Sequence, residues 1–382
     1  MSVKTLPIHP QPLPEELLSS WMVRLALANR FSLHTFYNKV IGYNGQIWTR
    51  DVDRSCSYEL IDLLHQYTKQ PRKVIQSLSL SSYEGLLFES LSSNALAPWI
   101  LSAGIFHRKR RNAALQYCPL CLREDSTPYF RKTWRLAFYV LCEHHNCLME
   151  STCPSCKQPV LHHRIGIGKE NTVPHMDISL CHYCGYCLKY VTPRYLYRPG
   201  CVAKHYLLKL LKHHSNGPWK CGNNLLSFGL AYFKGIWFLL SSLRSKKATV
   251  LREEINRATG LHLKASRYHT FEGADHSERL EYMLCISWIL SGWPKHYLSA
   301  CYKANYVRSS VAENPKKLPY WFNSIIDSQL GRKVYIRSDE EMLAACHYLY
   351  SQKQRVTRAN IISELGFSSD QAIRAAKIWA RL

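Results

Sequence analysis

Closely spaced cysteine pairs in the middle of the chain have the clearest chemistry. Two Cys-Pro-x-Cys motifs begin at Cys118 and Cys153, and this tight turn brings two thiolates to one tetrahedral zinc ion. Each motif needs a second pair of ligands to complete the site. A C-x2-H pair that begins at Cys142 can complete the first site, and a C-x2-C pair that begins at Cys181 can complete the second. Gly185 suits the left-handed turn that closes the last pair. The spacing predicts two zinc ions per chain, held by Cys118, Cys121, Cys142 and His145 and by Cys153, Cys156, Cys181 and Cys184.

Neighbouring residues leave alternatives open in both quartets. In the first, His144 could take the place of His145, and Cys147 also lies within reach. In the second, Cys187 could join Cys184 in place of Cys181. The motifs therefore predict the two sites more firmly than they predict every ligand.

The predicted zinc ions are expected to fold the protein and not to catalyse a reaction. Four protein ligands leave no open position for a catalytic water. Acidic residues lie mostly in helical surface patterns such as Glu253-Glu254, and not in the carboxylate cluster that a transposase or nuclease gathers around its metals. The chain also lacks a phosphate-binding GxxxxGK[ST] motif. We therefore predict no catalytic residue.

The charge of the chain points to a polyanionic partner. The 382 residues include 50 Lys and Arg but only 27 Asp and Glu, which gives a formal net charge of +23. Such a field attracts nucleic acid first. The longest nearly apolar stretch, 235–243, is too short to cross a bilayer, and the N-terminus lacks the pattern of a secretory signal. We expect a cytoplasmic protein.

Short helical patterns fill the first 111 residues. Apolar residues recur at helical spacing over 15–29, and shorter patterns cover 33–40, 57–67 and 74–80. These patterns predict a small helical module that resembles a helix-turn-helix. Its last piece carries a basic run that is a candidate for binding phosphate or a partner: Arg108, Lys109, Arg110 and Arg111.

The central and following regions have different compositions. Residues 112–200 hold the zinc motifs, and the aromatic segment 133–141 between them is expected to form a strand or a short buried segment. Residues 201–335 are apolar, and their tryptophans are expected mainly in a helical core. Helices are predicted near 203–212, 225–243, 248–259 and 278–291.

The last 46 or so residues, about 336–382, follow the pattern of a helix-turn-helix. One helix is predicted over 339–352, and two more follow on either side of Gly366, with caps at Ser338, Thr357 and Ser368 or Ser369. In that reading the nucleic-acid or partner contacts come from the last two helices and the loop before them. The candidate residues are Arg355, Arg358, Ser369, Gln371 and Arg374.

The order of these motifs resembles the TniQ/TnsD family of transposon target-selection proteins. The resemblance covers roughly residues 5–190 and rests on ordered features: Leu17-Leu18-Ser19-Ser20-Trp21, Cys118-Pro-Leu-Cys121, Trp134, Cys142-Glu-His-His145 and Cys153-Pro-Ser-Cys156. Some members of the family bind an attachment site directly. Others dock on a CRISPR Cascade complex with its guide RNA and recruit the AAA+ ATPase TnsC and the transposase. The resemblance implies a homodimeric, DNA-associated adaptor in a CRISPR-associated transposon, a bacterial protein that acts at the nucleoid.

The expected fold is mainly α, in four parts. These are an N-terminal helical module (1–111), a double zinc-finger or ribbon module with short strands (112–200), a helical domain (201–335) and a C-terminal helix-turn-helix (336–382). Two other functions fit the same charge, zinc motifs and terminal helices: a TnsD-type protein that reads an attachment site in DNA, and a zinc-ribbon transcription regulator. Only the ordered motif set decides against the transcription regulator.

Overall fold

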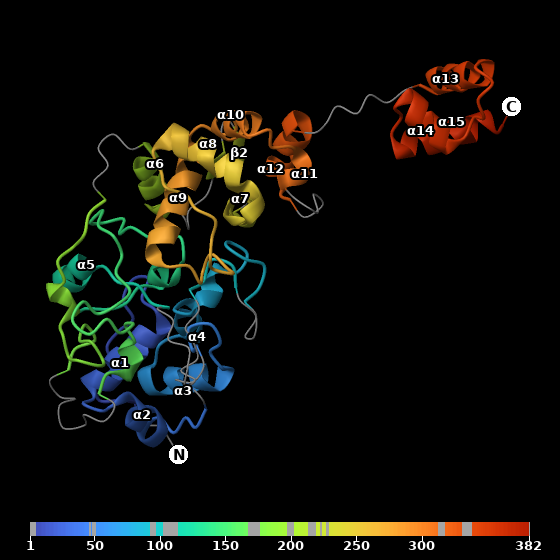
Figure 1. Cartoon of the computed structure of the whole chain (residues 1–382). Coiled ribbons are helices and arrows are strands. Elements are labelled where there is room, and N and C mark those ends of the chain that lie inside the picture. Colours follow the sequence, from blue (N-terminus) through green and yellow to red (C-terminus); the bar gives the residue numbers. More distant parts are fainter. Residues whose placement is uncertain are drawn as a thin grey trace. The chain divides into compact units, whose positions relative to one another are not determined.

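The computed structural model is mainly helical and divides into two compact units, residues 1–330 and 331–382 (Figure 1). It describes residues 5–45, 47, 51–91, 97–101, 114–166, 176–196, 202–212, 219–221, 224–226, 229–311, 318–330 and 338–381. Within these ranges the named strands form one antiparallel pair, β1 (Trp219–Cys221) with β2 (Asn224–Leu226). None of the described helices combines the length and the apolar character needed to span a bilayer.

The N-terminal helices pack around the first amphipathic helix. This helix, α1 (Leu18–Ala28), begins three residues later than its sequence pattern predicts, because Glu15 adopts a left-handed φ of 54°. Trp21 is fully buried in α1, and its indole donates a 2.8 Å hydrogen bond to the carbonyl of Pro10. The remaining elements of this part are α2 (Leu33–Thr35), a π-helical turn (Phe36–Val40), α3 (Tyr58–Thr68), α4 (Arg72–Ser77) and a 3-10 turn (Leu80–Tyr83).

A buried ionic cluster joins these helices to the cysteine-rich segment. Arg135 is 3% exposed and binds Asp51 at 2.5 Å and Asp53 at 3.0 Å. Asp53 accepts hydrogen bonds from the backbone amide and the hydroxyl of Ser19, and that hydroxyl also lies 2.9 Å from His162 Nε2. Burial raises the pKa of Asp53 to about 6, although the Arg135 guanidinium opposes the shift. The cluster thus ties together four segments that are distant in sequence.

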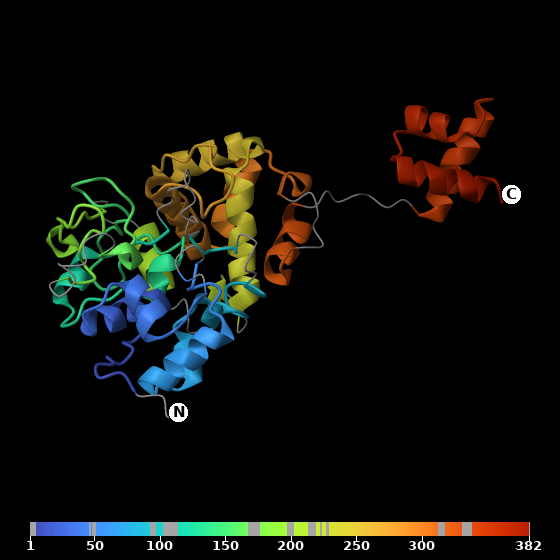
Figure 2. The same cartoon turned by 90° about the horizontal axis from the view of Figure 1, so that it is seen from below.

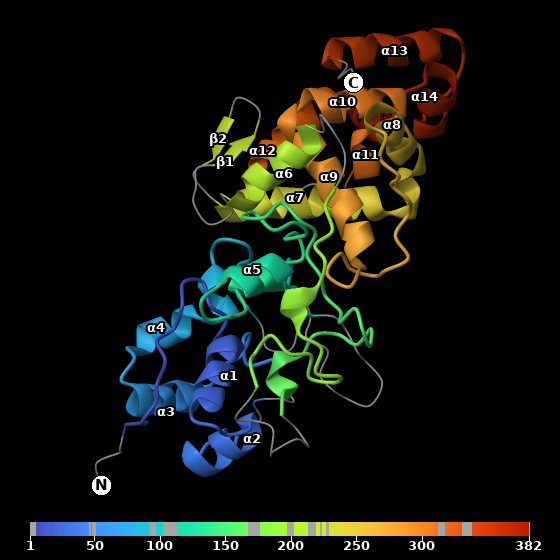
Figure 3. The same ribbon diagram turned by 90° about the vertical axis from the view of Figure 1, so that its left-hand side faces the viewer.

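The cysteine-rich segment contains little regular structure. It holds α5 (Pro119–Glu124) and 3-10 turns at Lys132–Arg135, His162–Arg164 and Leu188–Tyr190. For residues 133–141 we expected either a strand or a short buried segment, and the structure shows the buried segment. It starts in a 3-10 turn, and its residues are at most 5% exposed. Figures 2 and 3 show this green region beside both the blue N-terminal helices and the yellow to orange helices that follow it.

The rest of the first unit is helical. Its elements are α6 (Val202–Lys212), α7 (Gly229–Arg244), a 3-10 turn (Lys246–Ala248), α8 (Thr249–Thr259), α9 (His276–Ser291), α10 (Lys295–Lys303), α11 (Arg308–Val311), α12 (Tyr320–Ile325) and a π-helical turn (Ile326–Leu330). The predicted helix over 225–243 is wrong at its start, because Leu225 and Leu226 pair with Lys220 and Trp219 in the short hairpin. Trp293 and Trp321 are buried as expected, with rings 5.2 Å apart.

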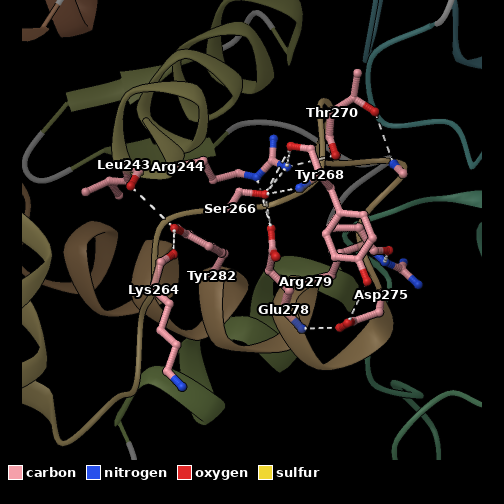
Figure 4. A network of polar contacts seen from close by, with 12 residues as sticks. Leu243, Arg244, Lys264, Ser266, Tyr268, Thr270, Asp275, Glu278, Arg279 and Tyr282 are labelled. Carbon is pink, nitrogen blue, oxygen red and sulfur yellow. Dashed lines mark hydrogen bonds and ion pairs between the residues drawn. The ribbon is translucent and has the colours of Figure 1, made fainter. Parts of the chain in front are cut away.

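Arginine side chains organise the loop between α8 and α9 (Figure 4). Arg244 donates to the Ser266 hydroxyl at 2.7 Å and to the carbonyls of Tyr268 and Thr270 at 3.0 and 2.8 Å. Arg279, 2% exposed, donates to the Ala137 carbonyl at 2.9 Å and so connects α9 to the segment between the cysteine pairs.

Two further hydrogen bonds link the same regions. His276 Nε2 donates to the Val140 carbonyl at 2.9 Å, and the Trp99 amide donates to Glu272 at 2.7 Å. The helices after residue 201 therefore belong to the same packed body as the cysteine-rich segment.

The second unit consists of α13 (Asp339–Ser351), α14 (Arg358–Leu365) and α15 (Ser369–Trp379) around a core of their own. The expected caps are present: Ser338 accepts from the Glu341 amide, Thr357 from the Asn360 amide, and Ser368 forms a capping box with Gln371. Gly366 ends α14 with a φ of 63°, a conformation that glycine adopts without the Cβ clash of other residues. The three helices predicted from the sequence are thus present.

Candidate metal centres

The first set of predicted ligands converges on one point. Cys118, Cys121 and Cys142 are at most 3% exposed, and their Sγ atoms lie 3.5, 3.3 and 3.5 Å from Nδ1 of His145. The Sγ atoms of Cys121 and Cys142 are 3.6 Å apart. Bonds of about 2.0–2.3 Å to a tetrahedral zinc ion place donor atoms about 3.5–3.8 Å apart. The spacing of these four donors therefore fits one zinc ion.

The second set converges in the same way but nearer the surface. The Sγ atoms of Cys153 and Cys184 are 3.6 Å apart, and those of Cys156 and Cys181 are 3.7 Å apart. In each quartet all four ligand atoms lie within 4.8 Å of one another. Cys153 and Cys181 are buried, whereas Cys184 is exposed. The two quartets together fit two zinc ions, the second closer to solvent.

One backbone turn builds three of the four ligand pairs. In each turn the backbone amide of the first ligand donates a hydrogen bond to the carbonyl of the residue five positions later. This bond is 2.8 Å long for Cys142, 2.9 Å for Cys153 and 2.8 Å for Cys181. The carbonyl of the same first ligand accepts a second hydrogen bond, 2.8–2.9 Å long, from the amide of the residue four positions later. The donor of this second bond has a left-handed φ in every case: Asn146 (54°), Lys157 (60°) and Gly185 (76°). The sequence indicated this turn only at Gly185, because glycine is the residue that most readily adopts the left-handed φ of this position.

The remaining pair uses the start of a helix. Cys118 is the N-cap of α5, and its sulfur accepts from the Cys121 amide at 3.5 Å. Pro119 occupies the first helical position, where the missing amide hydrogen costs nothing. The Cys-Pro-x-Cys motif therefore holds both thiols on one helical turn.

Residues around the quartets separate the alternative ligands. His145 belongs to the first quartet, whereas the His144 side chain is 60% exposed and lies 3.8 Å from Glu143. On the opposite edge of the His145 ring, Nε2 lies 2.8 Å from the carboxylate of Glu124. Such a carboxylate orients a ligating imidazole and raises its basicity. Spacing alone gave no signal for Glu124, which sequence reasoning missed.

In the second quartet the structure brings Cys181 together with Cys184. The Cys187 sulfur instead lies 3.8 Å from the hydroxyl of Ser179. The pair that the sequence favoured is thus the one in the quartet.

The proposed nucleic-acid or partner residues are spread over two regions. The basic run Arg108, Lys109, Arg110 and Arg111 lies outside the described residues. In the second unit, Arg374 is ion-paired with Asp339 at 2.6 Å, and the Arg358 guanidinium donates to the hydroxyl of Ser369. Arg355 is exposed, and Gln371 takes part in the capping box of α15. Several of these polar groups already have partners within the unit.

We expect the purified, reduced protein to contain about two zinc ions per chain, because two quartets have the geometry of closed tetrahedral sites. Elemental analysis by mass spectrometry against protein concentration measures this directly. A folded sample with no zinc would contradict the assignment of both quartets.

Comparison with known proteins identifies one domain. Residues 7–149 match the sequence model of the TniQ family. This range contains α1, the ion pairs of Arg135 with Asp51 and Asp53, and the complete first quartet, and it ends before the second. No curated protein is significantly similar to the chain. Residues 7–149 therefore form a TniQ domain.

Proposed function

We propose that the chain is a target-selection adaptor of a DNA transposon. In this role it links a target-recognition complex, CRISPR Cascade with its guide RNA, to the AAA+ ATPase TnsC and the transposase. It acts as a homodimer in the bacterial cytoplasm, at the nucleoid. The observation that carries the proposal is the TniQ domain at residues 7–149.

The domain and the metal centres support a binding role. A TniQ domain implies transposon target selection or DNA binding, and the family consists of non-catalytic adaptors. In our proposal, zinc ions bound by the two quartets have only protein ligands, so they stabilise the fold without activating water. We therefore assign no catalytic step to the chain.

The charge of the three helices in the second unit favours the RNA-guided adaptor over a direct reader of DNA. The helices of this unit lie within residues 338–382, which contain six Lys and Arg and five Asp and Glu; the other charged residues of the unit are Arg332, Lys333 and Arg337, which precede the helices in the sequence. Non-specific DNA affinity comes mainly from phosphate neutralisation, which helices with a net charge of only +1 supply weakly. With Arg374 already paired to Asp339, we assign the unit mainly to protein contacts.

A second candidate is a TnsD-type protein that recognises an attachment site. The arrangement of α14, Gly366 and α15 supports it, because a helix, a tight turn and a second helix can place that second helix in a major groove. Its exposed Arg374 is the best placed side chain for a base contact.

The two functions are tested by comparing co-purification with Cascade and guide RNA against footprinting on bare DNA. The adaptor co-purifies with Cascade and gives no sequence-specific footprint alone. Arg374→Ala then leaves target choice intact, because guide pairing provides the discrimination. If the chain reads DNA directly, the same change reduces discrimination by about 1–3 kcal/mol. A guide-independent footprint of the isolated protein would overturn the RNA-guided proposal.

Neutralising the basic run tests its contact with nucleic acid. Changing Arg108, Lys109, Arg110 and Arg111 together to Gln should weaken association with DNA or with the ribonucleoprotein. It should also flatten the salt dependence, since each lost phosphate contact removes about 0.9 of a released counterion from the slope. Changing Arg72 and Lys73 to Gln provides a basic, exposed control. An unchanged slope would exclude the run from phosphate binding.

A further inference from the structure

A fifth sulfur lies against the first quartet. The Sγ atom of Cys147 is 3.5 Å from the Sγ atom of Cys118, the same distance that separates Cys118 from Nδ1 of His145. The Cys147 side chain is fully buried, whereas the His145 side chain is 16% exposed. A fifth donor group therefore borders a quartet that already fills four coordination positions.

The backbone fixes this thiol in place. Cys147 occupies the fifth position after Cys142, and its carbonyl accepts the 2.8 Å hydrogen bond that closes the turn. The equivalent positions of the two matching turns in the second quartet are Gln158 and Tyr186. A bridge to Tyr195 holds Cys147 from its other side. Among the three equivalent turns, the position carries a thiol only beside the first quartet.

We propose that Cys147 is a reserve zinc ligand that completes the first site when His145 leaves it. The inference rests on the zinc sites of the proposed function but not on the role in transposition. Thiolates are strong ligands for zinc, and Cys147 needs no long movement to reach the ion because it already contacts Cys118.

The exchange balances without an outside reagent. The bond from the ion to Nδ1 of His145 breaks, a bond from the ion to Sγ of Cys147 forms, and the thiol proton passes to the released imidazole. Glu124, 2.8 Å from Nε2 of His145, then faces a cationic imidazolium. The site changes from three thiolates and one imidazole to four thiolates, and it stays closed to water. Loss of the most exposed ligand therefore does not release the metal.

Zinc content and ligand type test the proposal in four variants: His145→Ala, Cys147→Ser, the double variant and His144→Ala as a matched control. We expect two zinc ions per chain in each single variant, whereas the double variant should lose the first ion and with it most of the soluble, folded protein. X-ray absorption should detect nitrogen in the zinc shell of the wild type and of the Cys147→Ser variant, and only sulfur in His145→Ala.

Several outcomes would overturn the proposal. One is loss of a zinc ion from His145→Ala, with or without unfolding. Another is retention of two ions by the double variant, which would mean that water or another group completes the site. An all-sulfur shell in the wild type would show that His145 is not the usual ligand. Absence of zinc from the wild type would instead refute the zinc sites, and a metal-loaded protein that fails in transposition would refute only the proposed function.

Discussion

Cys118→Ser is expected to leave little or no folded first unit. The Cys118 sulfur is fully buried, and it is the N-cap of α5 as well as a member of the first quartet. Zinc binding to such sites contributes about 10–16 kcal/mol to folding at neutral pH, comparable to the entire stability of a typical domain. A serine hydroxyl replaces the thiolate poorly as a ligand, so the variant should aggregate or be cleaved during expression. Soluble yield and limited proteolysis measure the effect.

Cys187→Ser is the matched control for this variant. Cys187 lies in the same cysteine-rich segment, but its sulfur contacts Ser179 and not a quartet. The control should remain soluble and keep both metal ions. A soluble Cys118→Ser protein with two zinc ions and a normal protease pattern would contradict a folding role for the first site.

Arg135→Met is expected to be the most destabilising change away from the cysteines. The guanidinium binds both Asp51 and Asp53 and also donates to the Leu101 carbonyl at 2.9 Å, all with the side chain 3% exposed. Removing one partner of a buried ionic cluster typically costs about 3–5 kcal/mol, since the remaining charges are left unpaired. The midpoint of urea unfolding, followed by tryptophan fluorescence, should fall accordingly.

Two comparisons separate the buried charge from a general effect of losing arginine. Arg72→Met breaks an ion pair with Asp62 whose side chains are about half exposed, and such pairs contribute less than about 1 kcal/mol. Adding Asp51→Asn and Asp53→Asn to Arg135→Met should restore part of the lost stability, because it removes the unpaired carboxylates. Equal destabilisation by Arg72→Met and Arg135→Met would disprove this account of the cluster.

Local patterns in the sequence were enough to predict the parts of the fold that depend on neighbouring residues. The helices of the second unit are an example, since Ser338, Thr357 and Ser368 cap them and Gly366 separates two of them. The cysteine pairs are another, because a ligand spacing of two intervening residues already defines the turn. In these cases the residues that determine the structure lie within about six positions of one another.

Features that depend on distant residues could not be predicted in this way. Asp53 and Arg135 meet only because the chain folds back on itself, and each looks like a surface residue in the sequence. Glu15 has a left-handed φ that delays the start of α1, and the glutamate residue type gives no signal for this conformation. The hairpin at Trp219–Leu226 replaced the predicted beginning of α7 because pairing between two short strands outweighed an apolar helical pattern.

The contacts of α9 with the segment between the zinc ligands bear on how such proteins diversify. The recognisable domain ends at residue 149, yet Arg279, His276 and Glu272 supply hydrogen-bond partners to backbone groups inside it. A gene fusion that cut the chain at that boundary would leave these groups exposed and would discard the second quartet. Recombination should therefore exchange whole bodies of about 330 residues, whereas the C-terminal unit has a core of its own and can be exchanged separately.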